Sequence, residues 1–357
     1  MPASPETLAE ARRLRTLFED RSAQVVKADV LQPAETLLDL YGEDIRARAY
    51  LTSDPLRGEM VLRPDFTVPV VQMHMESQAE PARYTYAGKV FRKQETDETR
   101  ANEYVQVGYE VFDGQDPAGA DAEVFSAIAE ALAGLPVKAA TGDIGILTAA
   151  VAGLKTIETR KAALLRHIWR PGRFKSLLRR YGAAKVPAKR AALLASGDPF
   201  AGTGPEIGLR SRAEVEARIA ALRTDAEAAP ISAEEIALID EILGLRETAP
   251  NVLSALSDIA VDMPSISPAL DRMRARLDAM AGRGVDVDTL EFEGSYGRTS
   301  LEYYDGFVFG FTLVTRPDLP PLATGGRYDA LTAQLGQGRA VPAVGGVIRP
   351  DLVLEAR

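Results

Sequence analysis

The chain has 357 residues, of which 46% are hydrophobic and 26% charged, and its formal net charge is −9. Length and composition predict a globular protein of about two domains. The sequence contains no cysteine, which excludes disulfides and thiolate metal sites, and its two histidines argue against a histidine-based metal site. The N-terminus turns polar at once, and no apolar run reaches the ~20 residues of a membrane helix. We therefore expect no signal peptide, no membrane association and a cytoplasmic location.

The first part of the chain mixes helical and strand patterns. Helical spacing predicts a helix over 5–20, and the next segment reads as a strand, a turn at Pro33 and a short helix. Further on we expect a strand, a bend between Pro64 and Pro69 and a helix within 58–77, and two strands flanking a polar loop within 83–114. A helix that stops at Gly134 and a strand over 137–147 follow.

From about 145 to 285 the pattern is helical. Ser211 with Glu214, and Ser232 with Glu235, form capping boxes that start helices, and a further helix is expected from Ser267-Pro268 to Gly282. Strands return within 289–294, 301–314 and 342–349. Hairpin-like strands on both sides of helices predict an α+β fold with an antiparallel sheet. We expect one discontinuous domain, 1–145 with 286–357, and a mostly helical insertion over 146–285.

Positive charge is concentrated in one block of this middle segment. Residues 155–190 contain 12 lysines and arginines and one acidic residue, Glu158. Two solvated helices lying on the acidic body of the chain are the slightly favoured interpretation. The alternatives are a face for an acidic partner or for nucleic acid.

One predicted strand carries polar residues where a core strand would be apolar. In "EYVQVGYEVF", strand alternation places Gln106, Gly108, Glu110 and Phe112 on the same face. This face could line a polar pocket, in which glycine leaves room and the amide and carboxylate bind a ligand. Taken alone, the pattern favours the simpler interpretation, a solvent-exposed face of an antiparallel sheet.

Other polar groups punctuate the remaining motifs, none of which is specific alone. Arg92 ends a strand, where an arginine suits phosphate or carboxylate. Two prolines bracket Asp65 and Thr67. Further along, Tyr303 and Tyr304 are predicted on opposite faces of a strand, and a Gly-Gly turn is predicted to precede Arg327, Tyr328 and Asp329 at the start of a helix.

In their order, these motifs resemble those of histidyl-tRNA synthetase, a class II synthetase. The resemblance rests on "LRPDFTVPV", "GKVFRKQETDETRANEYVQVGYEVFDG", "LEYYDGFVF", "GGRYDALTAQLG" and "PAVGG", and it spans about 20–145 and 288–350. It implies an antiparallel sheet flanked by helices, a helical insertion domain in the middle, and dimerisation through residues near 24–40.

The resemblance also implies a ligand site. The family's histidine pocket would fall on Asp65 (usually Glu), Thr67, Gln106, Glu110, Tyr304 and Tyr328, with Tyr303 and Arg327 beside it. Arg92 would take the place of the arginine that holds the ATP α-phosphate. Gly345 and Gly346 would face the same cleft.

The sequence departs from the family pattern at positions that serve ATP binding and adenylate formation in the family. Gln94 stands where the family has an acid, Thr299 where it has an arginine, and Leu352 where an arginine clamps ATP. Arg298 is one position away, which in a strand turns it to the other face. Each such preorganised charge is typically worth ~3 kcal/mol or more of transition-state stabilisation. We therefore expect no adenylate formation, and we interpret 349–352 as the remnant of a nucleotide site.

This combination is typical of the synthetase-like regulatory subunits of ATP phosphoribosyltransferase, which lack the anticodon-binding domain. The resemblance implies a subunit without catalytic residues, cofactor or metal. It would assemble with a short catalytic subunit and respond to L-histidine, with no role for tRNA. The alternatives are a minimal histidine-activating enzyme and an RNA-binding paralogue.

Overall fold

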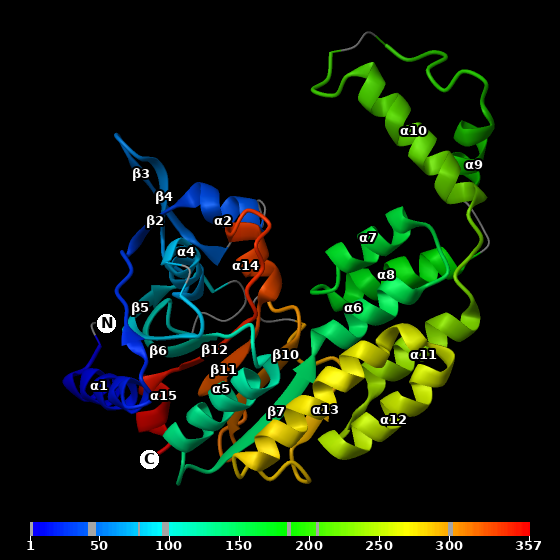
Figure 1. Cartoon of the computed structure of the whole chain (residues 1–357). Helices are drawn as coiled ribbons and strands as arrows, with labels where there is room; N and C mark the ends of the chain where they lie inside the picture. Colours follow the sequence, from blue (N-terminus) through cyan, green and yellow to red (C-terminus); the bar gives the residue numbers. More distant parts are fainter. Residues whose placement is uncertain are drawn as a thin grey trace.

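A large, mostly antiparallel sheet forms the centre of the protein (Figure 1). The computed structural model describes residues 3–41, 48–77, 79–94, 100–183, 187–204, 207–298 and 303–357. Pairs β1–β5 and β7–β9 are parallel and the other neighbours antiparallel. In spatial order the sheet contains β1 (Gln24–Val25), β5 (Ala82–Phe91), β6 (Glu103–Phe112), β12 (Ala343–Ile348), β11 (Ala323–Arg327), β10 (Phe307–Leu313), β7 (Val137–Asp143), β9 (Glu291–Glu293) and β8 (Arg246–Thr248).

Helices cover both faces of this sheet. One face packs against α1 (Pro5–Glu19) and α5 (Pro117–Ala131), with α13 (Ser267–Gly282) on α5 and α15 (Pro350–Glu355) against α1. There Tyr109 stacks on Phe18 with ring centroids 5.0 Å apart. The opposite face carries α4 (Thr67–Ser77), whose His74 stacks on Phe112 at 3.8 Å, and α14 (Asp329–Leu335) packs on α4.

A small sheet and a helical segment complete the fold. The sheet has the order β2 (Leu31–Pro33), β4 (Gly58–Leu62), β3 (Tyr50–Asp54), and α2 (Ala34–Tyr41) follows β2. The middle of the chain contains α6 (Ile144–Gly153), α7 (Glu158–Arg166), α8 (Pro171–Gly182), α9 (Ala188–Ala195), α10 (Arg212–Glu227), α11 (Ala233–Gly244), α12 (Ala249–Asp262) and a 3₁₀ turn, η2 (Pro264–Ile266). Helices α9 and α10 project from this segment as an arm (Figure 1).

The predicted fold class is confirmed, and so are several local signals. Both capping boxes form, at Ser211 and Ser232, and α13 has the predicted bounds. Gly134 adopts φ +83°, which favours glycine at the end of a helix. The predicted strand over 137–147 is too long, because the Asp143 side chain accepts a hydrogen bond from the Gly145 amide and starts α6.

The division into a discontinuous domain and an insertion stays a prediction. Although residues 146–285 are mostly helical, β8 lies within them and pairs with β9 in the main sheet. No described helix has the length and apolar character needed to cross a membrane.

Buried charges join this middle segment to the sheet. Arg276 of α13 donates from Nη2 to Asp143 Oδ2 at 2.9 Å, and its Nη1 lies 3.5 Å from Asp121 Oδ2 on α5. Arg327 of β11 donates to the other oxygen of Asp121 at 2.8 Å. These four side chains are all less than 9% exposed, so each charge depends on its partners.

Arg276→Ala is expected to lower the free energy of unfolding by about 3 kcal/mol or more, because it removes the buried cation that pairs with Asp143 and one of the two that neighbour Asp121. The matched control is Arg274→Ala on the same helix, whose exposed pair with Asp271 is worth at most ~1 kcal/mol. Urea unfolding measures both. Equal losses in the two variants would contradict a special role for the buried pair.

Candidate functional site

The polar residues of β6 face inward, beneath α4. Gln106 is 3% exposed and Glu110 is 1% exposed, so the interpretation of this face as solvent-exposed is wrong. Strand alternation places both on the side opposite Tyr109, which packs against α1. The result is a carboxylate and an amide enclosed between sheet and helix.

Glu110 is the centre of a hydroxyl cluster. Its Oε1 accepts hydrogen bonds from Thr67 Oγ1 at 3.0 Å and from the Tyr86 hydroxyl at 2.9 Å. Its Oε2 accepts one from the Tyr328 hydroxyl at 2.6 Å. The donors come from α4, β5 and the residue before α14, so one carboxylate joins four segments of the chain.

Glycines provide the space for this cluster. A Cβ at Gly345 would lie 1.4 Å from Glu110 Oε2, and a Cβ at Gly108 would lie 2.1 Å from the Tyr86 ring. Gly346 faces the opposite side of the sheet, toward Phe309 and Ile128. The expectation that both terminal glycines face the cleft is therefore right for Gly345 and wrong for Gly346, because neighbouring strand residues alternate.

Asp65 and Arg92 form the adjoining edge of the site. Asp65 is 4% exposed, and its Oδ1 lies 3.4 Å from the Val68 amide in the first turn of α4. Arg92 Nε donates to the carbonyl of Pro64 at 2.7 Å. Burial raises the pKa of Asp65, and the positive charge of Arg92 opposes that rise. A cavity of about 10 Å³ beside Asp65, lined also by Gln32 and Thr36, has room for about one water molecule.

Tyr303 and Tyr304 lie in the segment that leads into β10. Both are buried, their ring centroids are 4.7 Å apart, and the Tyr303 hydroxyl lies 3.4 Å from Thr67 Oγ1. The prediction that they occupy opposite strand faces is wrong, since β10 begins only at Phe307. Asp305 lies between Tyr304 and β10, and its carboxylate accepts a hydrogen bond from the Asp329 amide at the start of α14.

Arg327 does not belong to this site. Gly325 and Gly326 are part of strand β11, not of a turn, and alternation directs Arg327 to the α5 face, where it pairs with Asp121. Tyr328 follows at the end of the strand and reaches Glu110 from the site face. The structure thus brings Asp65, Thr67, Arg92, Gln106, Glu110, Tyr303, Tyr304 and Tyr328 together and separates Arg327 from them.

Tyr86 is a site residue that the sequence analysis missed. The register of the β5–β6 hairpin pairs it with Gly108, and its hydroxyl reaches Glu110. The signal was present, since a tyrosine paired across the strands with a glycine can lie over it. Finding Tyr86 required the register of the two strands, which the sequence does not predict because a long loop and not a tight turn connects them.

One polar atom of the site lacks a partner. Gln106 Oε1 is buried and has no hydrogen-bond partner within the described part of the chain. Buried acceptors are rarely left unpaired, so this oxygen suits a donor group of a ligand. The described residues contain no cluster of three or more side chains suited to a metal ion.

The residues at or near the positions that depart from the family pattern make contacts within the protein. Leu352 is 5% exposed and packs with Leu313 and Leu322. Gln94 donates to the carbonyl of Ala101 at 3.3 Å. Arg349 stacks over the Tyr104 ring, 4.1 Å from its centroid, and donates to Asp351.

Arg298 is held elsewhere, and its neighbour Thr299 lies outside the described residues. Arg298 is buried in a turn, not in a strand, and donates from Nε to the carbonyl of Ile168 at 2.8 Å. Burial lowers the pKa of its guanidinium to about 10. Its contacts therefore join the turn after β9 to the segment between α7 and α8.

The comparisons with known proteins agree on one family. The family model described as histidyl-tRNA synthetase matches residues 2–200 and 209–353. The ATP phosphoribosyltransferase regulatory subunit of Mesorhizobium japonicum is 30% identical over 358 residues, or 94% of each chain. That of Brucella canis is 31% identical over 370 residues, or 93% of each chain.

A solved structure agrees in fold. A protein of Bacillus halodurans, described as an ATP phosphoribosyltransferase regulatory subunit/histidyl-tRNA synthetase, superposes with a TM-score of 0.71 at 21% identity. The match covers 100% of this chain and 80% of that chain.

Glu110→Gln is expected to change how stability depends on pH. Burial raises the pKa of Glu110 to about 7, against the opposing effect of its hydroxyl partners, whereas an exposed glutamate titrates near ~4.3. Between these pH values the folded chain holds a proton that the unfolded chain has released. The wild type should therefore lose about 3 kcal/mol of stability from this group as the pH rises from 4.3 to 7.

Urea unfolding at several pH values between 4.5 and 8 measures the effect as the difference between wild type and variant. Glu103→Gln, which removes a half-buried carboxylate at the start of the same strand, is the control. Parallel profiles for the wild type and Glu110→Gln would contradict the assignment.

Proposed function

Since the chain belongs to the histidyl-tRNA synthetase family and, within it, to the ATP phosphoribosyltransferase regulatory subunits, we propose that it regulates that enzyme. It binds the catalytic subunit, supports the first step of histidine biosynthesis and relays L-histidine as a feedback signal. It catalyses no reaction itself. The relatives carry the name of a regulatory subunit. In this proposal the polar cluster around Glu110 binds L-histidine.

The observation that carries this proposal is the environment of Leu352. In the position that the family resemblance gives to an ATP-clamping arginine, this chain has a leucine packed among leucines. An apolar side chain offers nothing to a triphosphate, and loss of one preorganised charge typically costs ~3 kcal/mol or more in the transition state. The cluster around Glu110, in contrast, retains a full set of polar groups.

Histidine is a chemically reasonable ligand for that cluster. Its imidazole can donate to the Glu110 carboxylate, and its amino group can donate to the unpartnered Gln106 oxygen. Entry of the ligand would exchange hydroxyl contacts of Glu110 for contacts to the imidazole. Feedback then requires histidine to bind the active and inhibited assemblies with different affinities.

Mixing this chain with a purified catalytic subunit tests the function directly. We expect turnover of ATP with phosphoribosyl pyrophosphate to rise when the chain is added, and to fall again when L-histidine is added. If the catalytic subunit has the same activity with and without this chain, the proposal is wrong.

A minimal histidine-activating enzyme is the second candidate, because Arg92 is kept beside the polar cluster. The discriminating assay is histidine-dependent exchange of pyrophosphate into ATP by the chain alone. We expect no exchange above background. Exchange that disappears in Arg92→Gln would favour the enzyme.

Gln106→Leu is expected to weaken L-histidine binding about tenfold, because it removes an acceptor for the ligand's amino group. The stability of the variant should be unchanged or higher, since the oxygen has no partner to lose. Isothermal titration with histidine measures the affinity, and Gln334→Leu on exposed α14 surface is the control. Equal affinity in wild type and Gln106→Leu would place histidine elsewhere.

Two surfaces are proposed for assembly. Val30 and Leu31, about 40% exposed, lie in the 24–40 region through which the family resemblance implies self-association. Exposed Arg173 and Arg179 on α8 offer a face to an acidic surface of the catalytic subunit. In sedimentation experiments on the chain alone, Leu31→Asp should shift a dimer toward monomer. In sedimentation experiments with the catalytic subunit added, Arg173→Gln combined with Arg179→Gln should weaken the complex of the two proteins and leave the dimer unchanged. Unchanged sedimentation would exclude the respective surface.

A further inference from the structure

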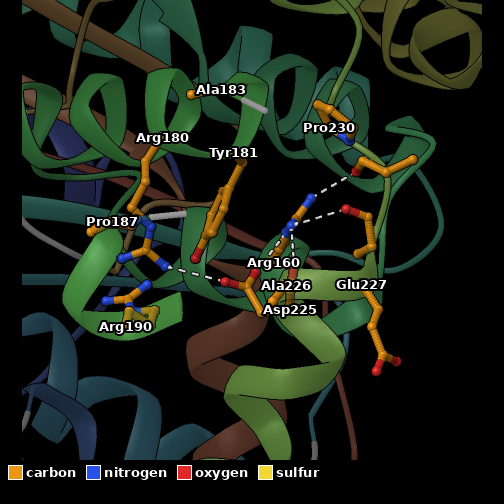
Figure 2. Close-up of a pocket in the computed structure, with 12 residues that line it drawn as sticks. Arg160, Arg180, Tyr181, Ala183, Pro187, Arg190, Asp225, Ala226, Glu227 and Pro230 are labelled. Carbon is orange, nitrogen blue, oxygen red and sulfur yellow. Dashed lines mark hydrogen bonds and ion pairs between the residues drawn. The ribbon is translucent and has the colours of Figure 1, made fainter. Parts of the chain in front are cut away.

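A cavity of about 290 Å³ lies where the projecting arm meets the helical segment (Figure 2). Its walls come from α7, α8, the start of α9, the end of α10 and the turn that follows α10. The lining residues are Arg160, Arg180, Tyr181, Ala183, Pro187, Arg190, Asp225, Ala226, Glu227, Ala228, Ala229 and Pro230. It is separate in sequence and in fold from the Glu110 cluster.

The floor of this cavity is rigidly built. Arg160 is 6% exposed, donates from Nε to Asp225 Oδ1 at 2.7 Å, and donates from Nη1 to the carbonyl of Ala229 at 2.8 Å. Its guanidinium also lies 5.2 Å from the centre of the Tyr181 ring. The N–H groups of Arg160 therefore donate to protein oxygens, and Arg160 fixes the position of Asp225.

Two further arginines are not satisfied in this way. Arg180 Nη2 lies 3.9 Å from Asp225 Oδ2, at the limit of an ion pair, and its guanidinium lies 4.8 Å from the centre of the Tyr181 ring. Arg190 is half-buried and forms no ion pair with any residue that the structure describes. In Figure 2 both guanidinium groups point into the same space, and the Glu227 carboxylate points away from them.

The charge in the cavity is therefore unbalanced. Three guanidinium groups line it, and the one carboxylate directed into it, Asp225, is already held by Arg160. Each free guanidinium edge can bind two oxygens of an anion. A monocarboxylate would satisfy one edge, whereas a phosphoryl group has enough oxygens and charge for both.

We propose that this cavity binds the phosphoryl group of a small molecule between Arg180 and Arg190. Its volume exceeds that of inorganic phosphate and accommodates a pyrophosphate or a phosphate ester. The faces of Tyr181 are contacted by Arg160 and Arg180, which leaves the ring little room to stack with a base. The site thus selects the phosphate and not a nucleobase. This proposal does not depend on the function proposed above.

Titration calorimetry on the full chain at physiological ionic strength tests the site. The probes are inorganic pyrophosphate and, separately, glucose 6-phosphate, which distinguish a free anion from a phosphate ester. We expect one of them to bind with a stoichiometry of one. Arg180→Gln combined with Arg190→Gln should lower that affinity about tenfold or more, because both charge-assisted contacts are lost.

The matched control is Arg179→Gln combined with Lys189→Gln, which removes the same charge from neighbouring positions that do not line the cavity. Its affinity should stay within about twofold of the wild type. Arg179, Arg180 and Lys189 are exposed and Arg190 is half-buried, so circular dichroism should show folded proteins in each case. Absence of binding by both probes, or equal losses in the two double variants, would overturn the proposal. Binding of an RNA duplex alone would overturn it in favour of a nucleic-acid contact.

Discussion

The buried carboxylate of Glu110 is the constraint around which the sheet face is organised. An enclosed carboxylate is costly unless its oxygens accept hydrogen bonds, and Thr67, Tyr86 and Tyr328 provide them. These donors lie on segments far apart in the sequence, so the carboxylate fixes the position of α4 and of the turn into α14. The same arrangement leaves a polar interior in which a small ligand can replace internal contacts.

Strand alternation in the sequence was sufficient to predict which residues of β6 share a face. It was not sufficient to decide whether that face meets solvent or a helix, because this depends on α4, which packs there through long-range contacts. Arg327 shows a different error, in which the family resemblance predicted a residue beside the site that lies elsewhere in the structure. A family resemblance transfers residue identities, but the strand into which Arg327 folds directs it to the α5 face, where Asp121 neutralises it.

Local signals were predicted more reliably than distant ones. The capping boxes and the bounds of α13 follow from residues within one helical turn and are confirmed. The basic block is a different case, because Arg160 is buried against Asp225, 65 residues along the chain. No pattern within 155–190 distinguishes this arginine from its exposed neighbours on α8. The pairing depends on how the chain returns after α10, which is tertiary information.

Gly345 and Glu110 are registered partners on adjacent strands, and one carboxylate oxygen occupies the space where a side chain at 345 would begin. This imposes an order on sequence divergence. Position 345 can acquire a side chain only after position 110 has become shorter, whereas position 110 can shorten while 345 is still glycine. A lineage that abandons the ligand would lose the carboxylate first, and its glycine would persist for a time as a record of the former site.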